Sequence, residues 1–161
     1  MTREFFYSAL FMLSFTLILS SCSSDDDDNS PSNNIQQIAQ IENDVASGTW
    51  QITNFIDSGQ DETSDFTGYN FTFNTNGTLL ATDGSNTLNG TWSITNDDSD
   101  DDSDDDDNDI DFNIAFPVTD SSDFEDLNED WDIVTVTSSV IQLRDDGDGN
   151  GDVDELTFEK N

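Results

Sequence analysis

The chain has 161 residues, enough for one domain and a tail. Asp and Glu number 37 against 3 Lys and Arg, so the net charge is −34, and such a field repels nucleic acid. One cysteine and no histidine exclude Cys/His zinc sites, Ser-His-Asp triads and Cys-His pairs. We therefore expect a protein that binds no nucleic acid and is not an enzyme.

The first 21 residues are predicted to be a signal peptide. Residues 5–19 are almost entirely apolar, which suits a signal-peptide core but is too short for a transmembrane helix of about 20 residues. The sequence Leu19-Ser20-Ser21-Cys22 resembles the bacterial lipobox. That resemblance implies cleavage before Cys22, acylation of Cys22 with fatty acids such as palmitate, and a stable membrane anchor. A plain secretory signal with a chance cysteine is the alternative.

Residues 22–33 are predicted to be the lipid anchor and a disordered acidic linker. Residues 23–33 include no apolar side chain and cannot contribute to a core. Their acidic run, residues 25–28, looks like the surface-export sequence that follows the lipid cysteine in Bacteroidetes-type lipoproteins. This resemblance implies an outer-membrane lipoprotein facing the cell surface, and a solvated spacer is the simpler alternative.

Residues 35–47 are predicted to form one amphipathic helix. The apolar residues at helical spacing are Ile35, Ile38, Ile41 and Val45. Asn33 or Asn34 can cap the start of this helix, and Gly48 can end it.

From residue 50 onward, apolar and polar residues alternate with the period of a strand. The expected strands cover residues 50–54, 69–73, 78–82, 88–94, 110–116, 131–137, 140–144 and 155–160. In the first strand, Trp50, Ile52 and Asn54 are expected to share a face, and residues 121–129 are expected to hold a helical turn. Eight strands joined without helices favour an antiparallel up-and-down barrel. The predicted fold is thus all-β, with a barrel domain over residues 34–161 and a short N-terminal helix.

The opening Gly48-Thr49-Trp50, after a short helix, resembles the lipocalin family, and more closely the small lipocalin-like domains of bacterial lipoproteins. The resemblance covers residues 35–161 and includes an aromatic second strand before an Asn-Gly turn, a second Gly-x-Trp at residues 90–92 and a closing strand at 156–160. The lipocalins' later motifs and disulfide are missing. The resemblance implies a barrel with a small apolar ligand or no known ligand, and no catalysis.

The barrel interior is the predicted ligand-binding site. Its candidate residues are Trp50, Tyr69, Phe71, Phe73, Trp92, Phe112, Trp131 and Arg144. The alternative is that the aromatic side chains simply fill the barrel, since eight-stranded barrels are just wide enough for side chains. Arg144 would then pair with a nearby carboxylate.

A second candidate site is a calcium loop. Its oxygen side chains would come from Asp146, Asp148, Asn150, Asp152 and Asp154, spaced as in the first nine positions of an EF-hand loop. The usual Glu at the twelfth position is a Thr, and the flanks are predicted strands. A Gly-rich hairpin is therefore the alternative, and no other cofactor is expected.

Residues 97–109 contain ten Asp. We expect a disordered, self-repelling acidic loop between two strands, with a weak divalent-cation sponge as the alternative.

Two functions remain open at this level. The leading one is a monomeric, lipid-anchored binding module for a small apolar or glycan ligand at the barrel mouth. The alternative is a structural or interaction lipoprotein with a packed dry barrel, acting through its acidic surface and, if the loop at 146–154 binds it, calcium. An apolar cavity would favour the first and a filled core the second.

Overall fold

The structure, a computed structural model, describes the backbone of residues 31–96, 110–146 and 153–161. It contains one α-helix, α1 (Pro31–Val45), and a single turn of 3-10 helix, η1 (Thr63–Phe66). The strands are β1 (Trp50–Asp57), β2 (Gln60–Asp61), β3 (Asn70–Phe73), β4 (Thr78–Thr82), β5 (Thr87–Asn96), β6 (Ile110–Ala115), β7 (Asp130–Val136), β8 (Val140–Asp145) and β9 (Asp154–Lys160).

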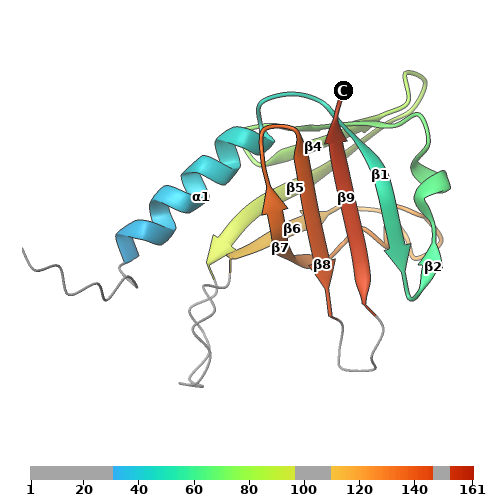
Figure 1. The fold of residues 1–161 in the computed structure, drawn as a ribbon. Helices are drawn as coiled ribbons and strands as arrows, with labels where there is room; N and C mark the ends of the chain where they lie inside the picture. The colour runs from blue at the N-terminus through green and yellow to red at the C-terminus, as the bar shows by residue number, and fades with distance from the viewer. Residues whose placement is uncertain (1–30, 97–109, 147–152) are drawn as a thin grey trace, which may run out of the picture.

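Eight of these strands form a closed barrel (Figure 1). From β3 to β9 each strand pairs antiparallel with the next, and β1 pairs with both β3 and β9. The two-residue β2 folds back on the end of β1 and lies outside the ring. The predicted eight-stranded up-and-down barrel with one short helix is confirmed.

The first strand differs from the prediction in its inward face. Trp50 and Ile52 are buried as expected, but the register against β9 shifts between Ile52 and Asn54. This irregularity turns Phe55, rather than Asn54, into the core. A bulge of this kind changes which residues face inward beyond it, so a strict period of two is wrong for this strand.

Helix α1 begins four residues before the predicted start. It covers Pro31–Val45, so the last residues of the predicted linker belong to the helix. Proline suits the first helical position because the amide hydrogen that it lacks would be unpaired there. Ile41 and Val45 are buried, and α1 contacts β5 and β7 (Figure 1). Within the described ranges, no helix has the length and apolarity needed to cross a membrane.

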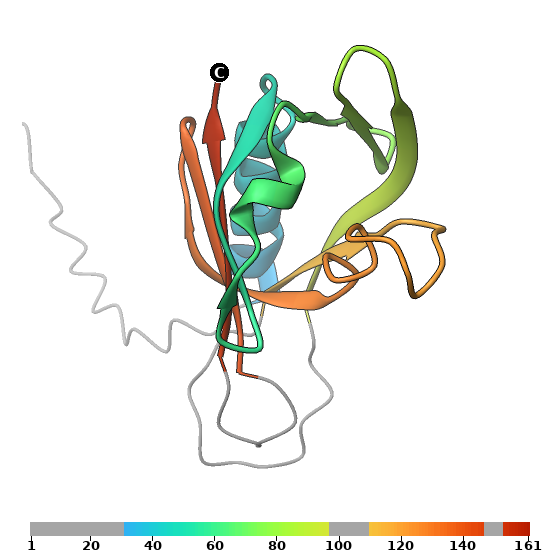
Figure 2. The ribbon, with the colours of Figure 1, turned by 90° about the vertical axis from the view of Figure 1, so that its right-hand side faces the viewer.

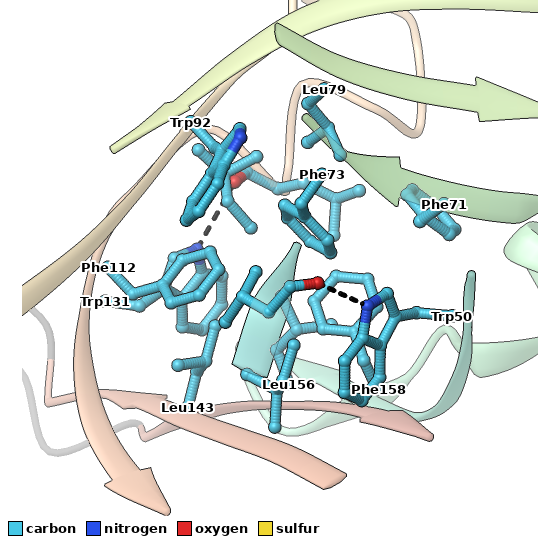
Figure 3. Packing of buried hydrophobic residues seen from close by; sticks show 14 of the residues in the cluster. Trp50, Phe71, Phe73, Leu79, Trp92, Phe112, Trp131, Leu143, Leu156 and Phe158 are labelled. Carbon is cyan, nitrogen blue, oxygen red and sulfur yellow. Dashed lines mark hydrogen bonds between the residues drawn. The ribbon is translucent and has the colours of Figure 1, made fainter. Parts of the chain in front are cut away.

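Aromatic rings fill the barrel interior (Figure 3). Phe73 on β3 packs edge-to-face on Phe112 of β6 and Phe158 of β9, at centroid distances of 5.6 and 5.5 Å. Neither strand neighbours β3 in the sheet, so these contacts cross the interior. Phe55 on β1 reaches Trp131 on β7 in the same way, at 6.4 Å. The centre of the barrel is therefore packed with side chains.

Two tryptophans of the barrel strands hydrogen-bond to segments that precede those strands. The indole N–H of Trp50 donates to the carbonyl of Val45 at the end of α1, at 2.8 Å, and that of Trp131 donates to the carbonyl of Leu127, at 3.3 Å. All buried apolar residues of the described chain lie between positions 41 and 158. A chain that starts at residue 23 therefore keeps the whole core.

Candidate functional site

A hollow of about 590 Å³ lies at the end of the barrel where β1 finishes and β3 begins. We call it the mouth groove. Its lining residues are Asp65, Tyr69, Ser85, Asn86, Thr87, Leu88, Ser121, Ser122, Asp123 and Phe124. They come from η1, the start of β3, the β4–β5 hairpin and the loop of residues 117–129, which we call the mouth loop. Figure 2 looks toward this side of the barrel.

One wall of the groove is the β4–β5 hairpin, shaped by Asp83. Its carboxylate accepts the backbone N–H groups of Ser85 and Asn86, at 2.7 and 2.6 Å, and the side-chain amide of Asn86. These hydrogen bonds hold the pKa of Asp83 below its ordinary value. Gly84 adopts a φ of 88°, which glycine supplies without strain. The hairpin therefore presents Ser85 and Asn86 at a defined place.

The opposite wall is the mouth loop, which is a run of turns. Backbone hydrogen bonds join Ser122 to Thr119, Glu125 to Ser122 and Asn128 to Glu125, each at 2.9 Å. The expected helical turn over residues 121–129 is thus replaced by successive tight turns.

The base of the mouth loop is clamped by Asn128. Its side-chain oxygen accepts the backbone N–H of Phe116 at 2.5 Å, and its side-chain amide donates to the Phe116 carbonyl at 3.1 Å. The Ile114 N–H donates to the Glu129 carbonyl at 3.0 Å. One side chain thus supplies both hydrogen bonds that a neighbouring strand would give to Phe116.

Phe124 lies between the mouth groove and the core. Its ring packs on those of Phe66, Tyr69, Phe71 and Phe116, at centroid distances of 5.3, 5.0, 6.1 and 5.0 Å. We call these four rings the Phe124 cradle. Three of the four contacts are edge-to-face, the arrangement that aromatic pairs prefer. Phe124 is 5% exposed, so a loop residue completes the packing of the barrel mouth.

Two carboxylates, those of Asp65 and Asp123, line the mouth groove. Burial raises the pKa of Glu62, and so do the nearby charges of Asp57, Asp126, Asp65 and Asp123. Burial likewise raises the pKa of Asp57 and of Asp126, with further contributions from neighbouring carboxylates. We call these five residues the rim carboxylates. Their summed field favours neutral or cationic ligands over anionic ones.

A second hollow, of about 370 Å³, lies between α1 and the turn that joins β3 to β4. It is lined by Ala39, Glu42, Asn43, Thr75, Gly77, Trp92 and Ser93. The Trp92 indole N–H already donates to the Asn74 carbonyl at 2.9 Å, so the most distinctive polar group near this hollow is engaged.

The structure divides the predicted interior site into three parts. The buried members are Trp50, Phe71, Phe73, Trp92, Phe112 and Trp131, all in the core. Tyr69 is half-buried and lines the mouth groove. Arg144 is exposed and pairs with Asp146 at 2.7 Å. The prediction that Arg144 lines the interior is therefore wrong, because in β8 it follows the inward-facing Leu143 and points outward.

Two of the five predicted calcium ligands lie in the described part of the chain. Asp146 pairs with Arg144, and the Asp154 carboxylate accepts the backbone N–H of Ser58 at 2.7 Å. Asp148, Asn150 and Asp152 lie outside the described residues. Among those that are described, no group of three or more metal-ligating side chains is arranged to hold an ion. The flanks are strands β8 and β9, which pair up to Asp145 and Asp154.

Other predictions also fall outside the described residues: the signal peptide, the lipidation of Cys22 and the acidic loop at 97–109. Sequence reasoning missed Phe124 as a site residue. The available signal was the pair Phe124 and Leu127, two apolar residues three apart in an acidic segment, both buried in the structure.

Strand pairing and groove together define an all-antiparallel, eight-stranded closed β-barrel with one helix and a hollow at its mouth. Comparison with solved structures finds similarity to the crystal structure of a DUF4847 family protein from Bacteroides vulgatus, with 21% identity and a TM-score of 0.47. The match covers 75% of this chain and 97% of that one. No family model and no curated protein matches the chain.

Proposed function

We propose that this protein is a lipid-anchored, cell-surface binding module, without enzymatic activity, that takes a small ligand at the mouth of a lipocalin-like barrel. The observation that carries the proposal is the contrast between the two parts of the barrel. Rings from distant strands meet inside it, whereas the mouth keeps a hollow of about 590 Å³. Ligand pockets of proteins span about 300–1,000 Å³, so the mouth groove has a suitable size.

The chemistry of the groove agrees with this role. Tyr69 and Phe124 offer aromatic surface, and Ser85, Asn86 and Thr87 offer hydroxyl and amide groups beside it. Seven of the ten lining residues are polar, so the groove suits a ligand with several hydrogen-bonding groups, such as a glycan, better than a wholly apolar ligand. The anchoring and surface location are supported by the lipobox-like Leu19-Ser20-Ser21-Cys22 and the acidic run at 25–28.

Native mass spectrometry of the full-length protein, purified in detergent from its own host, tests this function. Thr87→Trp should fill the groove and remove a co-purifying ligand. Thr91→Trp, at an exposed position on the same strand outside the groove, is the matched control and should keep it. An adduct retained equally by both variants, or absent from the wild-type protein, would contradict the proposal.

A filled interior also favours a second function, that of an interaction lipoprotein acting through its acidic surface. The supporting observation is again the packing of Phe73 against Phe112 and Phe158. A wild-type protein without any adduct would favour this second function over the first.

A further inference from the structure

We propose that Phe124 is a removable plug, whose ring occupies a site that a neutral, flat aromatic or apolar group of the ligand enters when the mouth loop opens. This inference rests on the proposed function, because it names the class of ligand for the same end of the barrel.

The Phe124 cradle fits an aromatic ring. Phe124 meets four other rings at 5.0 to 6.1 Å, three of them edge-to-face. This geometry suits any flat ring of similar size, since edge-to-face contacts depend on the ring and not on the chain that carries it. The Phe124 ring thus shows that the cradle accepts a flat apolar ring. The adjoining groove has room for the rest of a larger ligand.

The mouth loop is attached to the barrel mainly at its base. In the described structure, the backbone hydrogen bonds of residues 118–126 join residues within the loop or at its base. The base is fixed by the Asn128 clamp and by Trp131, which binds the Leu127 carbonyl. Phe124 is the buried side chain of the tip, with partly buried Val118 beside the core, while Leu127 is fully buried at the base. The tip can therefore leave its cradle while the base stays in place.

Charge also favours a loop that opens. Asp123 of the loop and Asp65 of η1 both line the mouth groove. Burial raises the pKa of Glu62, and so do the charges of Asp57, Asp126, Asp65 and Asp123. Like charges across the mouth oppose closure, so the ring contacts hold the loop shut against repulsion. The groove lining that the structure describes includes no Lys or Arg. A carboxylated ligand would therefore be rejected and a neutral one accepted.

The test uses residues 23–161, which keep the whole core, and two probes of nearly equal size: neutral indole-3-ethanol and anionic indole-3-acetate. Isothermal titration should show saturable binding of indole-3-ethanol to the wild-type chain and much weaker binding of indole-3-acetate. Phe124→Ala should bind indole-3-ethanol about tenfold more tightly or better, since the probe no longer displaces the plug. Thr91→Ala, at an exposed position on β5 outside the groove, leaves the loop and its ring unchanged and should bind as the wild-type chain does.

Two results would overturn the inference. Binding to Phe124→Ala without any binding to the wild-type chain would mean an engineered cavity and a purely structural Phe124. Equal affinity of the two chains would place the probe elsewhere. If near-ultraviolet circular dichroism shows that Phe124→Ala is unfolded, Phe124→Leu replaces it, with a smaller gain expected. Loss of a host-derived adduct in the Thr87→Trp variant would still support the proposed function, even if neither probe bound.

Discussion

The ammonium group of Lys160 lies 5.4 Å from the centroid of the Trp50 ring, where the last strand meets the first. The same Nζ donates to Ser47 Oγ at 2.7 Å and to the Ser138 carbonyl at 3.0 Å. A Cβ at position 48 would lie 2.5 Å from Lys160 Cε. Gly48 therefore leaves the space in which Lys160 covers Trp50, which gives the Gly-x-Trp sequence a physical role in closing the barrel.

Lys160→Ala should destabilise the fold by about 1–2 kcal/mol, through the lost cation–π contact and hydrogen bonds. Arg144→Ala is the matched control. It also removes one positive charge from a strongly acidic chain, but its ion pair with Asp146 is exposed, so we expect a change within about 0.5 kcal/mol. Thermal unfolding monitored by circular dichroism measures the stability of both variants. An equal decrease in stability for the two variants would mean that net charge determines the effect and that the contact of Lys160 with Trp50 does not stabilise the fold.

Asn128→Ala should destabilise the protein by about 1–3 kcal/mol, because the N–H and carbonyl of Phe116 both lose their partner. Asn113→Ala is the control, since Asn113 hydrogen-bonds the exposed Thr95 hydroxyl on the barrel wall. Urea unfolding of the two variants compares them. If the free energy of unfolding falls no further for Asn128→Ala than for Asn113→Ala, the Asn128 clamp contributes little to stability.

Acidification from pH 7 to about pH 5 should raise the melting temperature. Burial and neighbouring carboxylates raise the pKa of Asp57, Glu62, Asp126 and Glu129 above their ordinary values. The folded state then binds more protons than the unfolded one, so stability is fully present below the unfolded pKa of about 4 and is lost as the pH rises through the folded values. Added salt at pH 7 should act in the same direction, by screening. Constant melting temperatures across pH and salt would contradict this.

Calcium binding at residues 146–154 stays a prediction, with an expected dissociation constant in the millimolar to sub-millimolar range, about 10⁻⁴–10⁻³ M. Calcium must compete with Arg144 for Asp146 and with the Ser58 N–H for Asp154. Isothermal titration of the wild-type chain against the double variant Asp146→Ala, Asp148→Ala measures the binding. Absence of heat from the wild-type chain, or the same heat from both, would rule the loop out.

The barrel was predictable because its strands alternate between an apolar and a polar face. In β5, for example, Trp92 and Ile94 are buried while Thr91, Ser93 and Thr95 are exposed. Connections without predicted helices between the strands, one of them an Asn-Gly turn, left few other ways to bury these faces. The helix was predictable for the same reason, and only its ends shifted.

The features that were missed depend on tertiary contacts. The bulge in β1 brings Phe55 inward because pairing with β9 shifts there, and no local pattern encodes that shift. Phe124 and Leu127 form only one apolar pair in their acidic segment, which is too short a pattern to predict burial, so the burial of Phe124 follows from rings that converge from η1, β3 and the end of β6. Arg144 follows the alternation of β8, points outward and pairs with Asp146, which is the alternative that the sequence analysis gave for it.

The most direct test of the account is hydrogen–deuterium exchange on the full-length protein purified from its host, compared with the same protein after denaturing removal of ligand and refolding in the same detergent. Amides of loops that close on a ligand exchange more slowly when it is bound. We predict slower exchange in the ligand-bearing sample at residues 65–69 and 85–88, faster exchange at residues 121–124 because the mouth loop opens, and unchanged exchange in the interior-facing strands. Protection confined to the outer faces of the barrel, or identical exchange in the two samples, would contradict a binding site at the mouth.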